Sequence, residues 1–196
     1  MSRLPRIIAF TGRAGSGKDT AAAMLLELID ARYSEHAIRL AFADPIRACI
    51  RLMVAAGERH YLTDRALKEQ PIPSLGCSYR ELAQTLGDWG RSRHPDYWVR
   101  ILANSVVTWD SHIAVITDVR YPNEAEWIAA NDGVLIHINR PGIDGVREHS
   151  SETHVDQLGA TFTIHNLGTL AELQLAVEHT AARIAADKLV GQELEQ

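Results

Sequence analysis

The sequence has 196 residues and a mass of 21.7 kDa, the size of one domain with or without an inserted subdomain. Hydrophobic residues make up 46% and charged residues 23% of the chain, which is typical of a folded globular protein and excludes a disordered one. The net charge of −5 argues against a uniformly basic coat for nucleic acid, although it leaves room for a local basic cleft.

Strand-like and helix-like segments alternate along the chain. Short apolar runs predict buried strands at residues 6–11, 37–43, 112–117, 134–139 and 160–165. Helical periodicity and helix-start patterns predict helices at residues 17–33, from 44, 78–90, 96–109, from 123 and from 169. Residues 57–73 are mixed and polar and predict a mobile connection.

Three of the helix starts have recognisable capping residues. Asp44 is expected to be an N-cap, with Pro45 in the first helical position. Residues 123–126 form a variant of the capping box, and residues 169–172 form a second one. The starts of these helices are therefore predicted more sharply than their ends.

Strands that alternate with helices predict an α/β fold, with a parallel sheet covered on both faces in a three-layer sandwich. The long helical stretch between two strands predicts an inserted subdomain. We expect a core of residues 1–44 and 110–196, a helical insert at about 45–109, and a lid at about 140–156.

The sharpest motif is a glycine-rich loop between the first strand and the first helix. It reads Gly12, Arg13, Ala14, Gly15, Ser16, Gly17, Lys18, Asp19, Thr20. The first seven residues fit the phosphate-binding pattern G-x4-G-K, in which backbone N–H groups and a lysine surround phosphate oxygens. Asp19 stands where a serine or threonine hydroxyl usually meets magnesium. The metal contact is left to Asp19 or Thr20, and we favour the carboxylate of Asp19.

A second acidic position follows the apolar strand at residues 112–117. Asp118 stands at its carboxyl end, where ligands bind in open α/β sheets, and is expected to help hold magnesium unless it only starts a loop. Arg120 is placed to reach a phosphate. Asn123 and Glu124 serve either as ligands or only to start a helix.

Polar residues form a stripe on the helix predicted at residues 78–90. Arg80, Gln84, Gly87 and Arg91 fall within roughly 60° of arc at about 100° per residue. Leu82, Leu86 and Trp89 are expected on the opposite, anchoring face. The stripe faces either water or a cleft. The glycine favours a cleft, because glycine destabilises a helix by roughly 1 kcal/mol and permits close approach.

The segment after Arg140 is charged and contains glycine. Arg140 and Arg147 are expected to close over a triphosphate and stabilise charge on the transferring phosphoryl group, the alternative being a solvated surface loop. His149 has no zinc-ligand spacing to other histidines, so no zinc site is assigned.

Cysteine usage and hydropathy indicate in which cellular compartment the protein is expected. Cys49 and Cys77 form neither a C-x-x-C pair nor a metal site, which predicts reduced thiols in a cytoplasmic protein, the host cytoplasm if the protein is viral. The apolar run near the N-terminus is too short for a signal peptide. No stretch approaches the roughly 20 residues of a membrane span, so no membrane partner is expected.

Several of these segments together resemble the deoxynucleoside monophosphate kinases of bacteriophage type, within the P-loop kinase group. The matching segments, which cover most of the chain in order, are GRAGSGKDT (12–20), FADPIR (42–47), YRELAQTLGDWGR (79–91) with YWV (97–99), ITDVRYPNEAE (116–126), INRPG (138–142), HSSE (149–152) and HNLGTLAEL (165–173). The loop alone is generic, whereas its combination with the LGDWGR and DVRYPNEAE segments is much more specific.

The resemblance implies a P-loop NTPase fold and transfer of the γ-phosphoryl group of ATP to a deoxynucleoside monophosphate, with Mg²⁺. Lys18 and its loop would bind ATP phosphates, and Asn166 would contact adenine. Acceptor contacts would come from Asp44, Arg47, Arg80, Gln84, Arg91 and Trp98, although an N-cap role explains Asp44 equally well. The partners would be small molecules rather than nucleic acid, and a homodimer is left open.

The nearest rival among enzymes is a P-loop kinase of another small acceptor, such as dephospho-coenzyme A or phosphomevalonate. A nucleotide-dependent switch is disfavoured, because no lysine lies between Lys68 and Lys188 to form the Asn-Lys-x-Asp guanine reader of GTPases. A nucleotide binder without catalysis is the remaining non-enzymatic reading.

Overall fold

The computed structural model describes residues 4–109, 112–142 and 157–194. The chain divides into two compact units. We call Met1–Ala41 with Ala103–Gln196 the sheet unit, and Phe42–Leu102 the helical unit. The sequence placed the corresponding boundaries at about 45 and 109.

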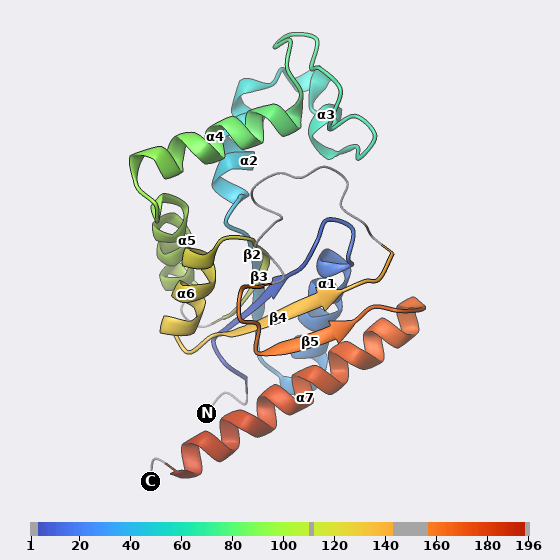
Figure 1. Cartoon of the computed structure of the whole chain (residues 1–196), viewed down its shortest axis with the longest axis vertical. Coiled ribbons are helices and arrows are strands. Elements are labelled where there is room, and N and C mark those ends of the chain that lie inside the picture. Colours follow the sequence, from blue (N-terminus) through green and yellow to red (C-terminus); the bar gives the residue numbers. More distant parts are fainter. Residues whose placement is uncertain (1–3, 110–111, 143–156, 195–196) are drawn as a thin grey trace. The chain divides into compact units, whose positions relative to one another are not determined.

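The described part of the sheet unit contains a parallel five-stranded sheet in the order β2-β3-β1-β4-β5 (Figure 1). Its strands are β1 (Ile7–Thr11), β2 (Ala37–Leu40), β3 (Ile113–Val119), β4 (Val134–Asn139) and β5 (Phe162–His165). The predicted parallel sheet is therefore confirmed, with small differences in strand length. The second strand stops at Leu40 rather than Ala43, where its pairing with β3 ends.

Helices cover both faces of this sheet. α1 (Lys18–Leu28) continues as a π-helical turn, η1 (Ile29–Tyr33), and packs with α7 (Leu170–Leu194) on one face. Their apolar side chains share a core with Ile136 and Ile138 of β4. Leu135, the residue before Ile136, points to the other face, toward α6 (Pro122–Ala130). This gives the three-layer α/β sandwich that the alternating pattern predicts.

The helical unit has a smaller apolar core of its own. It contains α2 (Asp44–Met53), the short turns η2 (Ala56–Glu58) and α3 (His60–Thr63), α4 (Tyr79–Arg93) and the first half of α5 (Tyr97–Thr108). Ile46, Ile50, Val54, Ile72 and Trp98 form its buried centre. Within the described chain, no helix is both long enough and apolar enough to span a membrane.

Two predicted strand and helix ends are corrected. Asp44 is not an N-cap, because α2 begins at Asp44 itself, with Ala43 as the cap. Its carboxylate instead pairs with Arg47 one turn along the helix. Asp118 lies inside β3, one residue before its end, rather than just after it, because the pairing of β3 continues to Val119 opposite Thr11.

The predicted capping box at residues 169–172 forms, and α4 begins with a capping box that the sequence analysis did not identify. The Glu172 carboxylate accepts from the N–H and hydroxyl of Thr169, and these bonds lower the pKa of Glu172. In α4 the Glu81 carboxylate accepts from the N–H of Ser78, which lowers the pKa of Glu81 in the same way. Both helices therefore begin where their sequences indicate.

Candidate functional site

The glycine-rich loop connects β1 directly to α1, as the phosphate-binding pattern requires. Three of its residues have positive φ: Gly12 at 140°, Gly15 at 79° and Gly17 at 102°. Gly17 is also the N-cap of α1 in a left-handed conformation. Residues with a side chain rarely adopt these angles, so the glycines allow the backbone to curl around the helix N-terminus. Between them, Arg13 and Ala14 are exposed.

The ends of two neighbouring strands support the loop. A Cβ atom at Gly12 would lie 2.5 Å from the carbonyl oxygen of Ile138 in β4. A Cβ atom at Gly17 would lie 2.6 Å from Nδ2 of Asn166, which follows β5. Both positions therefore need glycine for space as well as for backbone conformation.

Lys18 lies within the loop rather than in solvent. It is 8% exposed, and its Nζ donates to the carbonyl oxygens of Gly12 at 2.6 Å and Arg13 at 2.8 Å. The ammonium group thus lies beside the backbone that would surround a phosphate. A phosphate oxygen offers it a stronger, charge-assisted hydrogen bond than a carbonyl oxygen does.

A hydrogen bond between Asn166 and Ser16 joins the residue after β5 to the loop. Asn166 Nδ2 donates to the carbonyl oxygen of Ser16 at 2.9 Å, and both residues are buried. The Ser16 hydroxyl is buried and bonds to none of the described residues. The resemblance implied that Asn166 contacts adenine, whereas the contact in the structure is with the loop backbone.

Two carboxylates of the sheet unit are candidates for a magnesium site. Asp19 and Thr20 are exposed in the first turn of α1. Asp118 is half-buried on β3, the strand paired with β1, and its neighbour Val119 accepts a hydrogen bond from the Thr11 hydroxyl at 3.0 Å. Carboxylate oxygens suit Mg²⁺, which keeps several waters and takes one or two protein carboxylates together with phosphate oxygens, so this donor set fits the ion.

The segment after β3 resolves one open alternative. Glu124 is 5% exposed, and its carboxylate accepts from the N–H groups of Arg120 at 2.7 Å and Tyr121 at 3.1 Å. Glu124 is therefore the third residue of α6, which has Tyr121 as its N-cap, so the capping residues are 121–124 rather than the predicted 123–126. The side chain of Arg120 is half-buried, and that of Asn123 is too.

Of the two predicted lid arginines, Arg140 lies within the described residues and Arg147 does not. Arg140 directly follows β4 and is exposed. Arg147 and His149 lie outside the described residues, as does most of the predicted lid. Their closing role therefore stays a prediction.

The helical unit carries the predicted polar stripe on α4. Arg80, Gln84, Gly87 and Arg91 all lie on this helix, and Leu82 and Leu86 pack against the core of the unit as expected. The side chain of Trp89 is 47% exposed, so its expected place on the anchoring face is only partly right. Its ring still makes an edge contact with Tyr97.

Arginines of the predicted acceptor set are paired with carboxylates within the helical unit. Arg80 forms an ion pair with Glu69. Arg91 Nη2 lies 2.8 Å from Asp88 Oδ1, and Arg47 Nη1 lies 2.6 Å from Asp44 Oδ1. These pairs hold the guanidinium groups in place, and the side chains of Arg80 and Arg47 are still 51% and 41% exposed.

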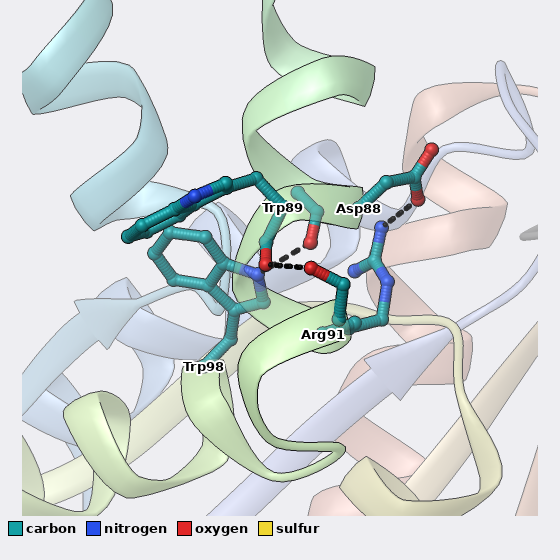
Figure 2. Close-up of polar contacts among 6 residues, drawn as sticks. Asp88, Trp89, Arg91 and Trp98 are labelled. Carbon is teal, nitrogen blue, oxygen red and sulfur yellow. Dashed lines mark hydrogen bonds and ion pairs between the residues drawn. The ribbon is translucent and has the colours of Figure 1, made fainter.

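Two glycines of α4 have different neighbours. Gly87 lies under the guanidinium of Arg91, which a Cβ atom would approach to 2.8 Å, and its carbonyl oxygen accepts from Trp98 Nε1 at 2.9 Å. Gly90 lies against the ring of Trp98, which a Cβ atom would approach to 2.6 Å. Figure 2 shows the rings of Trp89 and Trp98 on one side of this turn and the Asp88–Arg91 pair on the other.

Trp98 therefore differs from its expected role. It is 7% exposed and belongs to the buried centre of the helical unit. The one polar atom of its side chain, Nε1, donates to the carbonyl oxygen of Gly87. The structure shows a packing role for Trp98 within the helical unit, and its contact with an acceptor stays a prediction.

Sequence reasoning missed three features. The Asn166–Ser16 contact joins residues 150 positions apart, which no local pattern indicates. Glu69 lies in the connection to which no role was given. The third feature is the steric constraint at Gly90, which is stronger than that at Gly87 because the ring of Trp98 packs against it. A glycine followed by an aromatic residue early in the next helix was the sequence signal that could have indicated this packing.

Comparison with known proteins gives consistent matches. Residues 74–177 match the family model described as deoxynucleotide monophosphate kinase. A protein of Acanthamoeba polyphaga mimivirus named a deoxynucleotide monophosphate kinase is 31% identical over 163 residues, which cover 76% of this chain and 81% of that protein. The deoxynucleoside-5'-monophosphate kinase of Escherichia phage T5 is 36% identical over 92 residues, covering 41% of this chain and 37% of its own length.

A solved structure gives a weaker likeness. The shikimate kinase of Bacteroides thetaiotaomicron is 14% identical, with a TM-score of 0.46, over 89% of this chain and 95% of that one. The parallel sheet order and the conformation of the glycine-rich loop identify the fold without this likeness.

Proposed function

The chain belongs to the deoxynucleotide monophosphate kinase family, and from this membership we propose that it transfers the γ-phosphoryl group of ATP to a deoxynucleoside 5'-monophosphate, giving the diphosphate and ADP. The observation that carries the proposal is the loop of residues 12–18, whose left-handed glycines and folded-in lysine form a phosphate site at the start of α1. The alternative acceptors, dephospho-coenzyme A and phosphomevalonate, are set aside in favour of the family's substrate class.

The sheet unit would bind the donor. Backbone N–H groups of the loop and the N-terminus of α1 provide a positive environment for the phosphates. Lys18 would exchange its bonds to Gly12 and Arg13 for bonds to phosphate oxygens. Arg120, Arg140 and Arg147 would add positive charge as charge develops on the transferring group. The acceptor phosphate is already a nucleophile near pH 7, so no strong general base is required.

The helical unit would bind the acceptor. Arg80, Arg91 and Arg47 present guanidinium groups suited to a monophosphate, and Gln84 lies on the same helix as the first two, where an amide can read a base edge. Trp98 would keep this helix in place from below. The exposed part of the stripe is then a binding surface rather than a merely solvated face.

We assign the metal to Asp19 and Asp118, with Thr20 as the alternative to Asp19. Bound Mg²⁺ would neutralise charge on the phosphate oxygens of the donor. The protein side chains would hold it on the side of the loop next to β3, the strand that carries Asp118.

The other expectations follow from this reaction. Nucleotides would be the partners, with neither nucleic acid nor a membrane required, and the cytoplasm would supply both substrates. A homodimer is not needed for any step, because the candidate residues all come from one chain.

The proposal is tested by following the label from γ-³²P-ATP in the presence of a deoxynucleoside monophosphate. We expect label in the deoxynucleoside diphosphate with the unaltered protein, and a loss of at least about a hundredfold in Lys18→Ala, because a charged donor to the transferring group is removed. The thermal unfolding temperature of the variant should stay close to that of the parent. Transfer at the parent rate in Lys18→Ala would contradict the assignment of the loop.

A further inference from the structure

The Ser16–Gly17 peptide of the phosphate loop is bonded to the side chain of Asn166, the residue that follows β5. Asn166 is 9% exposed, and its Nδ2 donates to the carbonyl oxygen of Ser16 at 2.9 Å. Its own N–H donates to the carbonyl oxygen of Asn139 at 2.7 Å, which fixes the residue to the end of β4. The amide that contacts the loop is therefore itself part of the rigid edge of the sheet.

This contact determines which way a neighbouring donor points. In a trans peptide the C=O and N–H bonds point in opposite directions. When Asn166 holds the Ser16 carbonyl, the N–H of Gly17 is turned away from β5. Gly17 is the N-cap of α1, where N–H groups have no partner within the helix and anions bind.

The peptides around this one are also constrained. In the preceding Gly15–Ser16 peptide, the N–H of Ser16 donates to the carbonyl oxygen of Arg13 at 3.1 Å. A side chain at Gly17 would collide with the Asn166 amide at 2.6 Å. Gly17 and Asn166 therefore pack closely against one another. The hydrogen bond from Asn166 to the Ser16 carbonyl oxygen links the Ser16–Gly17 peptide to the residue after β5.

We propose that Asn166 is a positioning residue of the phosphate loop, which holds the Ser16–Gly17 peptide so that the Gly17 N–H faces the triphosphate of the donor. It acts through the backbone and touches no substrate, in place of the adenine contact that the resemblance implied. The proposal rests on the proposed function for the identity of the ligand as a nucleoside triphosphate.

The test compares Asn166→Ala with the parent by calorimetric titration of ATP, GTP and inorganic tripolyphosphate, each with Mg²⁺. Leaving a buried carbonyl without its donor should weaken all three by the same factor, roughly five- to a hundredfold. The KM for the acceptor should not change. Weakened ATP binding with unchanged tripolyphosphate binding would make Asn166 an adenine contact and overturn the proposal, as would no change in any of the three.

Asn131→Ala is the matched control. The Asn131 amide also donates to a main-chain carbonyl, that of Trp127 at 2.8 Å, but it lies after α6 and before the opposite end of β4. Its variant should bind all three ligands as the parent does. A loss equal to that of Asn166→Ala would contradict a specific role for Asn166.

Asn166→Asp keeps the shape of the side chain, and it tests the positioning role of Asn166 if the alanine variant does not fold. Its carboxylate repels the Ser16 carbonyl when ionised and donates to it when protonated. The ratio of parent to variant affinity for tripolyphosphate should therefore fall as the pH falls from 7 toward about 4.5, and a constant ratio would overturn the proposal. Tripolyphosphate binding needs no acceptor, so a failure of the kinase assignment would not be mistaken for a failure here.

Discussion

At the scale of single residues, the predicted acceptor arginines are held by ion pairs that a substrate can replace. The pair of Arg80 and Glu69 has side chains that are 51% and 43% exposed. Exposed pairs of this kind contribute only about 0–1 kcal/mol. A bound phosphate dianion makes stronger, charge-assisted bonds with a guanidinium, so it should displace Glu69 at little cost.

This leads to a pair of opposite expectations for acceptor binding. Arg80→Ala should raise the KM for the deoxynucleotide about tenfold or more, with a much smaller effect on the KM for ATP, because a charged hydrogen bond is lost. Glu69→Gln should lower the KM for the deoxynucleotide by up to about fivefold, because the competing carboxylate is gone. Steady-state kinetics with each substrate varied in turn measures both. Equal effects on the two KM values would remove Arg80 from the acceptor site.

At the scale of elements, helix α4 contains two glycines whose replacement should have opposite consequences. At Gly87 a methyl group meets the end of the flexible Arg91 side chain, whereas at Gly90 it meets the buried ring of Trp98. A flexible side chain can move aside, but a packed indole ring cannot.

Gly87→Ala should therefore keep or slightly raise stability, because alanine favours a helix by roughly 1 kcal/mol over glycine. It should raise the KM for the acceptor by displacing Arg91. Gly90→Ala should lower the free energy of unfolding by about 1–3 kcal/mol through overpacking. Thermal unfolding and steady-state kinetics of the two variants separate these effects. A Gly87→Ala variant that loses stability while keeping its acceptor KM would contradict the account.

Element types and order could be predicted from the sequence because each depends on local pattern. The apolar runs of β1 and β4 and the capping residues of α7 are contiguous in the chain, and the structure confirms them. The cap of α2 was wrong by one residue, because Asp44 finds a partner in Arg47 within the helix. Single-residue shifts of this kind depend on side-chain pairing that a local pattern does not contain.

The site could be predicted only in part, for the same reason. The loop of residues 12–18 is contiguous, and its glycine conformations are as the motif requires. The support that Asn166 gives to the loop depends on the register of β5 beside β4. The packing of Trp98 against Gly90 depends on how α5 folds back on α4. Both are long-range consequences of topology.

At the scale of the whole molecule, the chain combines a proposed phosphate site in one unit with a stripe that contains paired arginines in another. The chain has 25 acidic and 20 basic residues, so its overall charge does not favour binding of anions and attraction of a phosphate has to come from such local groups. A kinase with these two features should act on a small, doubly charged acceptor that also has a base to be read, and simple phosphates should be poor substrates.

Phosphoryl transfer to a deoxynucleoside monophosphate is tested by measuring the rate of ADP formation from Mg-ATP with individual acceptors. Each deoxynucleoside and ribonucleoside monophosphate, dephospho-coenzyme A and phosphomevalonate would be supplied separately. We expect strong stimulation by one or more deoxynucleoside monophosphates and little by dephospho-coenzyme A or phosphomevalonate. Stimulation by dephospho-coenzyme A or phosphomevalonate alone, or by no acceptor while ATP still binds, would contradict this expectation.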